Sequence, residues 1–115
     1  MNVVIECDPE LVEHARRLVM ESVKSYLRAN CSRILSLSKL ALQKSVKIEF
    51  HGLFRHYSGD EKLPRFMDAL AVLLRCMGSD NLEIIQGSRL VIRDEEGYLV
   101  VLVESLENFC REIMV

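Results

Sequence analysis

The sequence predicts an α+β protein whose elements follow the order strand, helix, strand, helix, three strands, helix (βαβαβββα). Two observations lead to this prediction. In the first third of the chain, apolar residues recur every three or four positions, as on one face of a helix. In several later segments they alternate with polar residues or cluster between turn residues, as in strands. We therefore expect a mixed, mainly antiparallel sheet with a long N-terminal helix.

Length and composition predict a single domain over residues 1–115. Half of the residues are apolar and 28% are charged, which is the balance of an ordinary globular protein. No repeat, linker or low-complexity segment divides the chain. No apolar run approaches the ~20 residues of a membrane span, and the first residues lack the features of a signal peptide. These observations predict no membrane association and an intracellular location, cytoplasmic or nuclear.

The four cysteines stand far apart, at positions 7, 31, 76 and 110. Zinc ribbons and redox motifs require close pairs, which are missing from this spacing. In a reducing compartment, an isolated cysteine behaves as a small buried hydrophobe. The sequence therefore predicts free, mostly buried thiols rather than disulfides.

The first helix has a well-marked start and an ambiguous end. A short β-branched strand at residues 3–5 is followed by Asp8, a good N-cap, and by Pro9 at the first helical position. Neither Gly nor Pro occurs between Pro9 and Gly52, and the helical pattern continues to Leu42. One long helix, or two helices separated near Asn30, fits this pattern.

The end of this helical segment is apolar around more than half of its circumference. The sheet of one short chain can cover one side of such a helix, so the other side needs a second helix or a partner subunit. This predicts an interface formed by Ile34, Leu35, Leu37, Leu40 and Leu42.

Later elements are predicted from changes in period and from turn residues. Residues 45–57 alternate as a strand with a bulge at Gly52, and residues 63–77 form a helix closed by Gly78. Strands at 82–85, 90–93 and 98–103 follow, with an acidic loop at 94–97, and Ser105 caps a final helix. The strand at 98–103 is apolar on both faces, which predicts a central strand covered on both sides.

The charge distribution suggests a second function. Between Ser22 and Ile48 there are six basic residues and no acidic one, although the net charge of the chain is -2. Clustered Lys and Arg can bind the phosphates of nucleic acid without base contacts. The alternative prediction is a nucleic-acid-binding module that uses Lys24, Arg28, Arg33, Lys39, Lys44 and Lys47.

The chain lacks a recognisable catalytic or metal-binding motif, and the five glycines are too dispersed for a phosphate-binding loop. We therefore predict no cofactor and no metal. Polar residues gather at the end of the second predicted strand, which leaves a third possibility of a small enzyme with its site at His51, Arg55, His56 and Tyr57. The favoured prediction is a non-catalytic protein-interaction or assembly module that acts as a homo- or hetero-oligomer.

Overall fold

The computed structural model describes residues 7–78, 82–93 and 96–114, and within these ranges it confirms an α+β fold. The predicted strand at residues 3–5 lies outside the described residues. The described elements are four helices and a three-stranded sheet: α1 (Pro9–Leu40), β1 (Ser45–Glu49), α2 (Phe50–Phe54), α3 (Phe66–Met77), β2 (Arg89–Arg93), β3 (Glu96–Leu102) and α4 (Val103–Met114).

The sheet is antiparallel in both of its described strand pairs, and its spatial order is β1-β3-β2. The most apolar strand, β3, lies in the centre, as the sequence predicts. Leu99 is paired with Ile48 on one side and with Leu90 on the other. This register places Ile48, Leu99 and Val101 on the face that is buried in the core.

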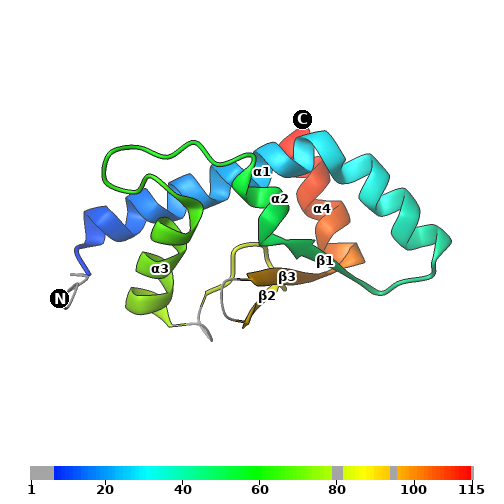
Figure 1. Ribbon diagram of the computed structural model, residues 1–115. Coiled ribbons are helices and arrows are strands. Elements are labelled where there is room, and N and C mark those ends of the chain that lie inside the picture. Colours follow the sequence, from blue (N-terminus) through cyan, green and yellow to red (C-terminus); the bar gives the residue numbers. More distant parts are fainter. Residues whose placement is uncertain (1–6, 79–81, 94–95, 115) are drawn as a thin grey trace.

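Helices α1, α2 and α4 lie on one side of the sheet, and α3 lies beside it (Figure 1). On the opposite face of β3, Tyr98 and Val100 are partly exposed and Leu102 is 52% exposed. The prediction that β3 is covered on both sides is therefore wrong. Antiparallel sheets commonly leave one face in water, and this one does so even though its central strand is apolar there.

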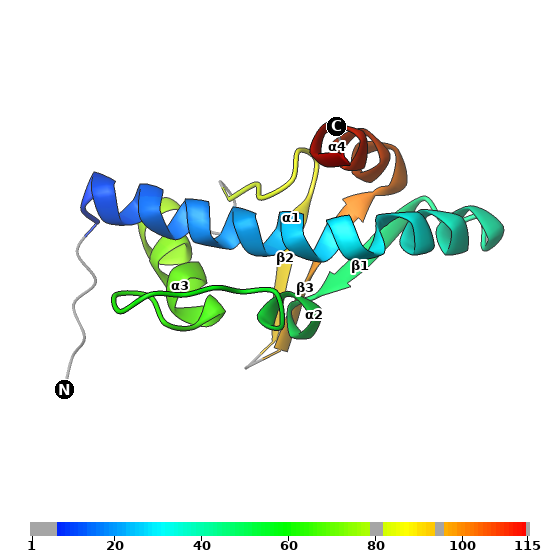
Figure 2. The same ribbon diagram turned by 90° about the horizontal axis from the view of Figure 1, so that it is seen from above.

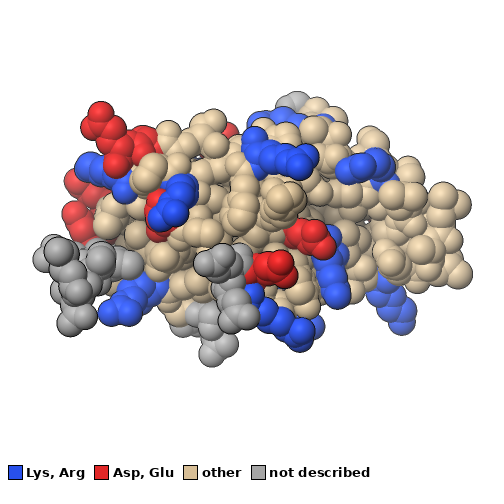
Figure 3. Space-filling view, in the orientation of Figure 1, with Lys and Arg blue, Asp and Glu red and all other residues tan. Residues whose placement is uncertain are grey.

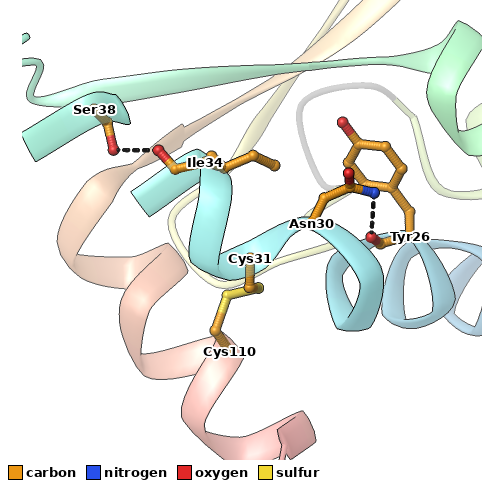
Figure 4. Close-up of a disulfide and its surroundings, with 6 residues drawn as sticks. All are labelled: Tyr26, Asn30, Cys31, Ile34, Ser38 and Cys110. Atoms are coloured by element: carbon orange, nitrogen blue, oxygen red, sulfur yellow. Dashed lines mark hydrogen bonds between the residues drawn. A yellow bond between two sulfur atoms is a disulfide. The ribbon is translucent and has the colours of Figure 1, made fainter. Parts of the chain in front are cut away.

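Helix α1 begins where the sequence predicts and continues without a break. The Asp8 side chain accepts a hydrogen bond of 3.1 Å from the Glu10 amide, and Pro9 occupies the first turn. Asn30 fits inside the helix because its side-chain amide donates to the Tyr26 carbonyl at 2.8 Å (Figure 4). The view from above shows one long helix crossing the other elements (Figure 2). Of the two alternatives, the single helix is therefore the observed one.

The predicted strand at residues 45–57 is wrong beyond Glu49, where α2 begins. Phe50 and Leu53 are both buried, and their spacing of three residues points both side chains into the core only if the backbone is helical. Gly52 lies against α1 rather than at a bulge. A Cβ atom at this position would stand 2.8 Å from the Tyr26 ring, so a larger residue would have to displace that side chain.

Helix α3 starts at Phe66, three positions later than predicted, because Asp60 organises a separate turn before it. The Asp60 carboxylate accepts hydrogen bonds from the amides of Lys62 and Leu63 at 3.0 and 2.9 Å. The predicted end of the helix is confirmed: Gly78 has a φ of 78° and donates its amide to the Leu74 carbonyl.

The last third of the chain contains fewer strands than predicted. Residues 82–85 form no strand, and Leu82, Ile84 and Ile85 are buried in an irregular segment closed by a turn at Ser88. Of the predicted acidic loop, residues 94–95 lie outside the described ranges and residues 96–97 belong to β3. Helix α4 begins at Val103, directly after β3, rather than at a Ser105 cap. Leu82, Ile84 and Ile85 are apolar because they fill the core, and they do so without forming the hydrogen bonds of a strand.

The prediction of free thiols is wrong: the four cysteines form two disulfides. Cys7–Cys76 joins the start of α1 to the end of α3, with a Cα–Cα distance of 5.4 Å. Cys31–Cys110 joins α1 to α4, with a Cα–Cα distance of 6.3 Å (Figure 4). The pairs are 69 and 79 residues apart in sequence, so only the tertiary fold brings them together.

Candidate interaction surface

The five residues of the predicted interface fall into two groups. Ile34 and Leu35 are partly buried and pack against the core. Leu37, Leu40 and Leu42 are 59%, 82% and 89% exposed. We call these three exposed residues the leucine end. They lie on the last turns of α1 and on the turn that follows, which extend past α4 and the sheet in both ribbon views (Figures 1 and 2).

The leucine end projects because α1 is longer than the layer that it covers. A helix of 32 residues is about 48 Å long, which accounts for the molecule's longest dimension of 49 Å. Residues Ala15 to Cys31 supply the buried stripe of α1, and beyond Cys31 only Ser38 is buried. The final turns therefore contribute little to the core.

The turn after α1 has the hydrogen bonds of a Schellman motif. The Gln43 amide donates to the Ser38 carbonyl at 2.9 Å, and the Leu42 amide donates to the Lys39 carbonyl at 3.2 Å. In this motif the residue at the position of Leu42 adopts a left-handed conformation, and here its φ is 54°. Glycine is the usual residue at this position, because a Cβ atom there is in steric conflict with the backbone.

Leu42 is therefore unfavourable for folding in two respects. Its backbone conformation is one that L-residues adopt at a cost of about 1–2 kcal/mol, and its side chain is 89% exposed to water. A glycine would form the same turn without either cost. Among the described non-glycine residues, Leu42 is the one with a positive φ. An outlier of this kind is a reason to seek a role outside the fold.

Three interactions involve residues next to the leucine end. The Ser38 hydroxyl donates to the Ile34 carbonyl at 2.8 Å within the helix (Figure 4). Lys39 forms an ion pair of 3.4 Å with Glu107 on α4. Just after the turn, the Lys44 carbonyl accepts a 2.9 Å hydrogen bond from the Val103 amide.

The tip that carries the leucine end has few charged side chains (Figure 3), and Leu102 is a further exposed apolar residue of the sheet. Leu102, at the end of β3, lies opposite Ser45 in the sheet and is half exposed. In the space-filling view, the tip formed by the last turns of α1 shows few charged side chains (Figure 3). Exposed apolar residues that lie together on a protein surface are typical of contact sites for other molecules.

The six basic residues of the nucleic-acid alternative are spread over different surfaces. Lys24 and Arg28 line a shallow hollow of about 430 Å³ between α1 and α4, which Glu112 also lines. Lys39 is paired with Glu107, while Lys47 lies on the open face of the sheet with its Nζ 4.8 Å from the centre of the Tyr98 ring. Arg33 donates to the Asn30 side chain at 2.8 Å, and Lys44 is exposed after the turn.

The four residues of the enzyme alternative have separate surroundings. His51 is exposed and lines a hollow of about 610 Å³ together with Phe54 and Tyr98. His56 instead contacts α1, with Nδ1 2.9 Å from the Ser25 hydroxyl. Arg55 is exposed. These positions follow from α2, because His51 lies within this helix and His56 lies in the turn after it, where its amide donates to the Leu53 carbonyl.

The Tyr57 side chain packs within the fold instead of facing an open site. Its hydroxyl donates to the Leu63 carbonyl at 2.7 Å, and its ring meets Phe66 edge to face. Burial, followed by the nearby carboxylates of Asp60 and Asp68, raises the pKa of Tyr57 above its ordinary value. The neutral phenol therefore persists as a hydrogen-bond donor.

Two features of this surface escaped the sequence analysis. Glu104 and Glu107 lie beside the basic end of α1, although they follow it by some sixty residues in sequence. The left-handed backbone of Leu42 also has no signal in the sequence, because the residue that normally marks such a turn is glycine. The sequence indicated only that the helical pattern ends at Leu42, and not the backbone conformation of that residue.

Within the described ranges, no helix combines the length and the hydropathy of a membrane span, and no three side chains of His, Cys, Asp or Glu are grouped to hold a metal ion. No protein-family model, curated protein or solved structure matches the chain.

Proposed function

We propose that the protein is a small non-catalytic interaction and assembly module that binds another polypeptide through the leucine end of α1. The observation that carries this proposal is Leu42, an exposed apolar side chain on a left-handed backbone at which glycine would be the more stable residue. A partner that buries Leu42 gives a physical reason for its presence.

Leu37 and Leu40 support the same conclusion. They lie three residues apart on the same projecting helix, so one partner surface can contact both. Burial of a leucine side chain contributes about 1.5–3 kcal/mol, so three such residues can provide the centre of a specific interface. The charged residues around them, Lys39, Lys44 and Glu104, are suited to a polar rim.

Site-specific cross-linking in cells that make the protein tests this proposal. A photoreactive benzoylphenylalanine replaces Leu40, and the control carries the same group at Glu21, an exposed position on the first half of α1. We expect a discrete protein adduct from position 40 and none from position 21. Equal adducts from both positions, or none from position 40, would overturn the proposal.

The other two functions have weaker support. Lys24 and Arg28 are near Glu112, and Lys39 forms an ion pair with Glu107, so a nucleic-acid strand would have to cross acidic groups to reach the six basic residues. His56 and Tyr57 are occupied by contacts with Ser25 and Leu63. Both functions remain predictions from the sequence that no specific contact favours.

The intracellular location predicted from the sequence also stays a proposal. The sequence predicts an intracellular protein, but disulfides are typical of oxidising compartments and of extracellular proteins, with those of intracellular hyperthermophile proteins as an exception. Thiol labelling of the protein directly after lysis, with and without a reductant, distinguishes these environments.

A further inference from the structure

We infer that the polypeptide covering the leucine end is a second copy of this chain, in a two-fold symmetric dimer. This inference rests on the proposed function and names its partner. In such a dimer both subunits use the same patch, so each group on the patch must find a complementary group on that same patch. The described residues at this end of the molecule meet that requirement in shape and in charge.

The shape allows two copies to approach. The leucine end lies at the tip of the molecule, beyond α4 and the sheet, so the bulk of each domain stays behind the contact (Figures 1 and 2). Two projecting helix ends can therefore lie side by side, with Leu37 and Leu40 of one subunit against the same residues of the other. Leu42 extends the apolar contact to the turn.

The charges are self-complementary because the end carries both signs. Lys44 follows the turn after α1, while Glu104 lies in the first turn of α4. The hydrogen bond between the Lys44 carbonyl and the Val103 amide places the two residues on neighbouring backbone. Both are exposed, and neither has an ion-pair partner within the described part of the chain.

A wholly basic patch would repel its own copy. From Lys24 to Lys47, all of the charged residues in the sequence are basic. The fold changes this by placing α4 beside the end of α1. Glu107 on α4 forms ion pairs with both Lys39 and Arg111, at 3.4 and 3.2 Å, and so offsets part of the basic charge there. The remaining pair of unpartnered charges can form two equivalent contacts across the two-fold axis, Lys44 of each subunit with Glu104 of the other.

Mixing two charge-reversal variants tests this arrangement directly. Lys44→Glu places two acidic groups on the patch, and Glu104→Lys places two basic groups there. Each variant alone brings like charges together twice in the dimer, and we expect the dissociation constant to rise about tenfold. In an equimolar mixture, the all-acidic patch of one variant can meet the all-basic patch of the other. Both contacts across the axis then join opposite charges, so a heterodimer with near wild-type affinity should form.

Sedimentation velocity from about 1 to 500 μM, with the disulfides intact and at low salt, measures this association. The matched controls are Arg17→Glu and Glu21→Lys, which reverse exposed charges on the first half of α1 and should leave the dimer unchanged. Thermal unfolding of each variant confirms that it is folded. A third variant, Leu40→Glu, should abolish the dimer, because it places a charge within the apolar contact.

Each other outcome overturns the inference. A wild-type protein that remains a monomer throughout this range excludes the second copy, as does a dimer that survives Leu40→Glu. A mixture no more associated than its separate components excludes the two-fold charge pairing. These failures are distinct from failure of the proposed function: a cross-link from position 40 to a different protein, or an adduct with nucleic acid, would identify another occupant of the same surface.

Discussion

The two parts of α1 differ in what their apolar residues do. From Ala15 to Cys31, the apolar stripe is buried beneath α2, α3 and α4, and the Cys31–Cys110 disulfide fixes its end. From Ser32 to Leu42, leucines are more frequent, and three of the four, Leu37, Leu40 and Leu42, are exposed. Apolar residues thus stabilise the fold in the first part of α1, whereas those at its end and in the following turn remain available for a partner.

The largest difference should appear when the disulfide at the boundary is removed. Replacing both Cys31 and Cys110 by Ala removes a cross-link that spans 79 residues, which should lower the free energy of unfolding by about 4 kcal/mol. Urea denaturation measures this change. Because the leucine end lies beyond the cross-link, dimer affinity below the unfolding transition should change less than twofold. A loss of association in the folded variant would show that the two parts are not independent.

Truncating a leucine in each part sharpens the comparison. Leu27 is fully buried, so Leu27→Ala should cost about 3 kcal/mol of stability through lost burial and a cavity. Leu40 is 82% exposed, so Leu40→Ala should change the stability of the monomer by less than about 0.5 kcal/mol. Chemical denaturation at a concentration below the dimer dissociation constant makes this measurement. Equal costs at both positions would contradict the division of α1.

Leu42→Gly should separate stability from association. Relief of the left-handed strain should raise the free energy of unfolding by about 1 kcal/mol, partly offset by the greater freedom of glycine in the unfolded chain. Loss of the exposed side chain should weaken association several-fold. Leu42→Asn is the control, since asparagine tolerates this conformation but is polar. A destabilised glycine variant would mean that Leu42 serves the fold.

The smallest expected effect concerns pH and belongs to Asp60, in the segment before α3, which contacts the start of α1. The Leu63 amide, and then His14 on α1, lower the pKa of Asp60 below its ordinary value of 3.8. A carboxylate with a lowered pKa stabilises the folded state above its unfolded pKa, and that stability is lost as the pH falls through the folded value.

Asp60→Asn should therefore destabilise the protein at pH 7 and have a smaller effect below about pH 3.5. Urea midpoints of the variant and of the wild type, measured from pH 7 to pH 2.5, test this. A difference that is independent of pH would show that Asp60 acts by its shape and not by its charge. The dimer, which depends on the other end of α1, should show no change with Asp60→Asn at pH 7.

The sequence by itself determined the features that depend on neighbouring residues. Asp8 and Pro9 specify the start of α1, Gly78 the end of α3, and the apolar run from Tyr98 the central strand. The wide apolar sector at the end of α1 was equally local; of its five residues, Leu37, Leu40 and Leu42 are exposed, whereas Ile34 and Leu35 pack against the core. These signals are readable because capping, turn formation and helical period involve residues only a few positions apart.

Tertiary structure alone decided the features that join distant residues. Phe50 and Leu53 became helical because the core accepts both side chains, although their segment alternates as a strand. The cysteines paired because the fold brings together residues that are separated by 69 positions in one pair and by 79 in the other. Likewise, Glu104 gave the leucine end its second charge only because α4 packs beside α1. The physical reason is the same in each case: burial and electrostatic interaction depend on distance in space, which the order of residues does not specify.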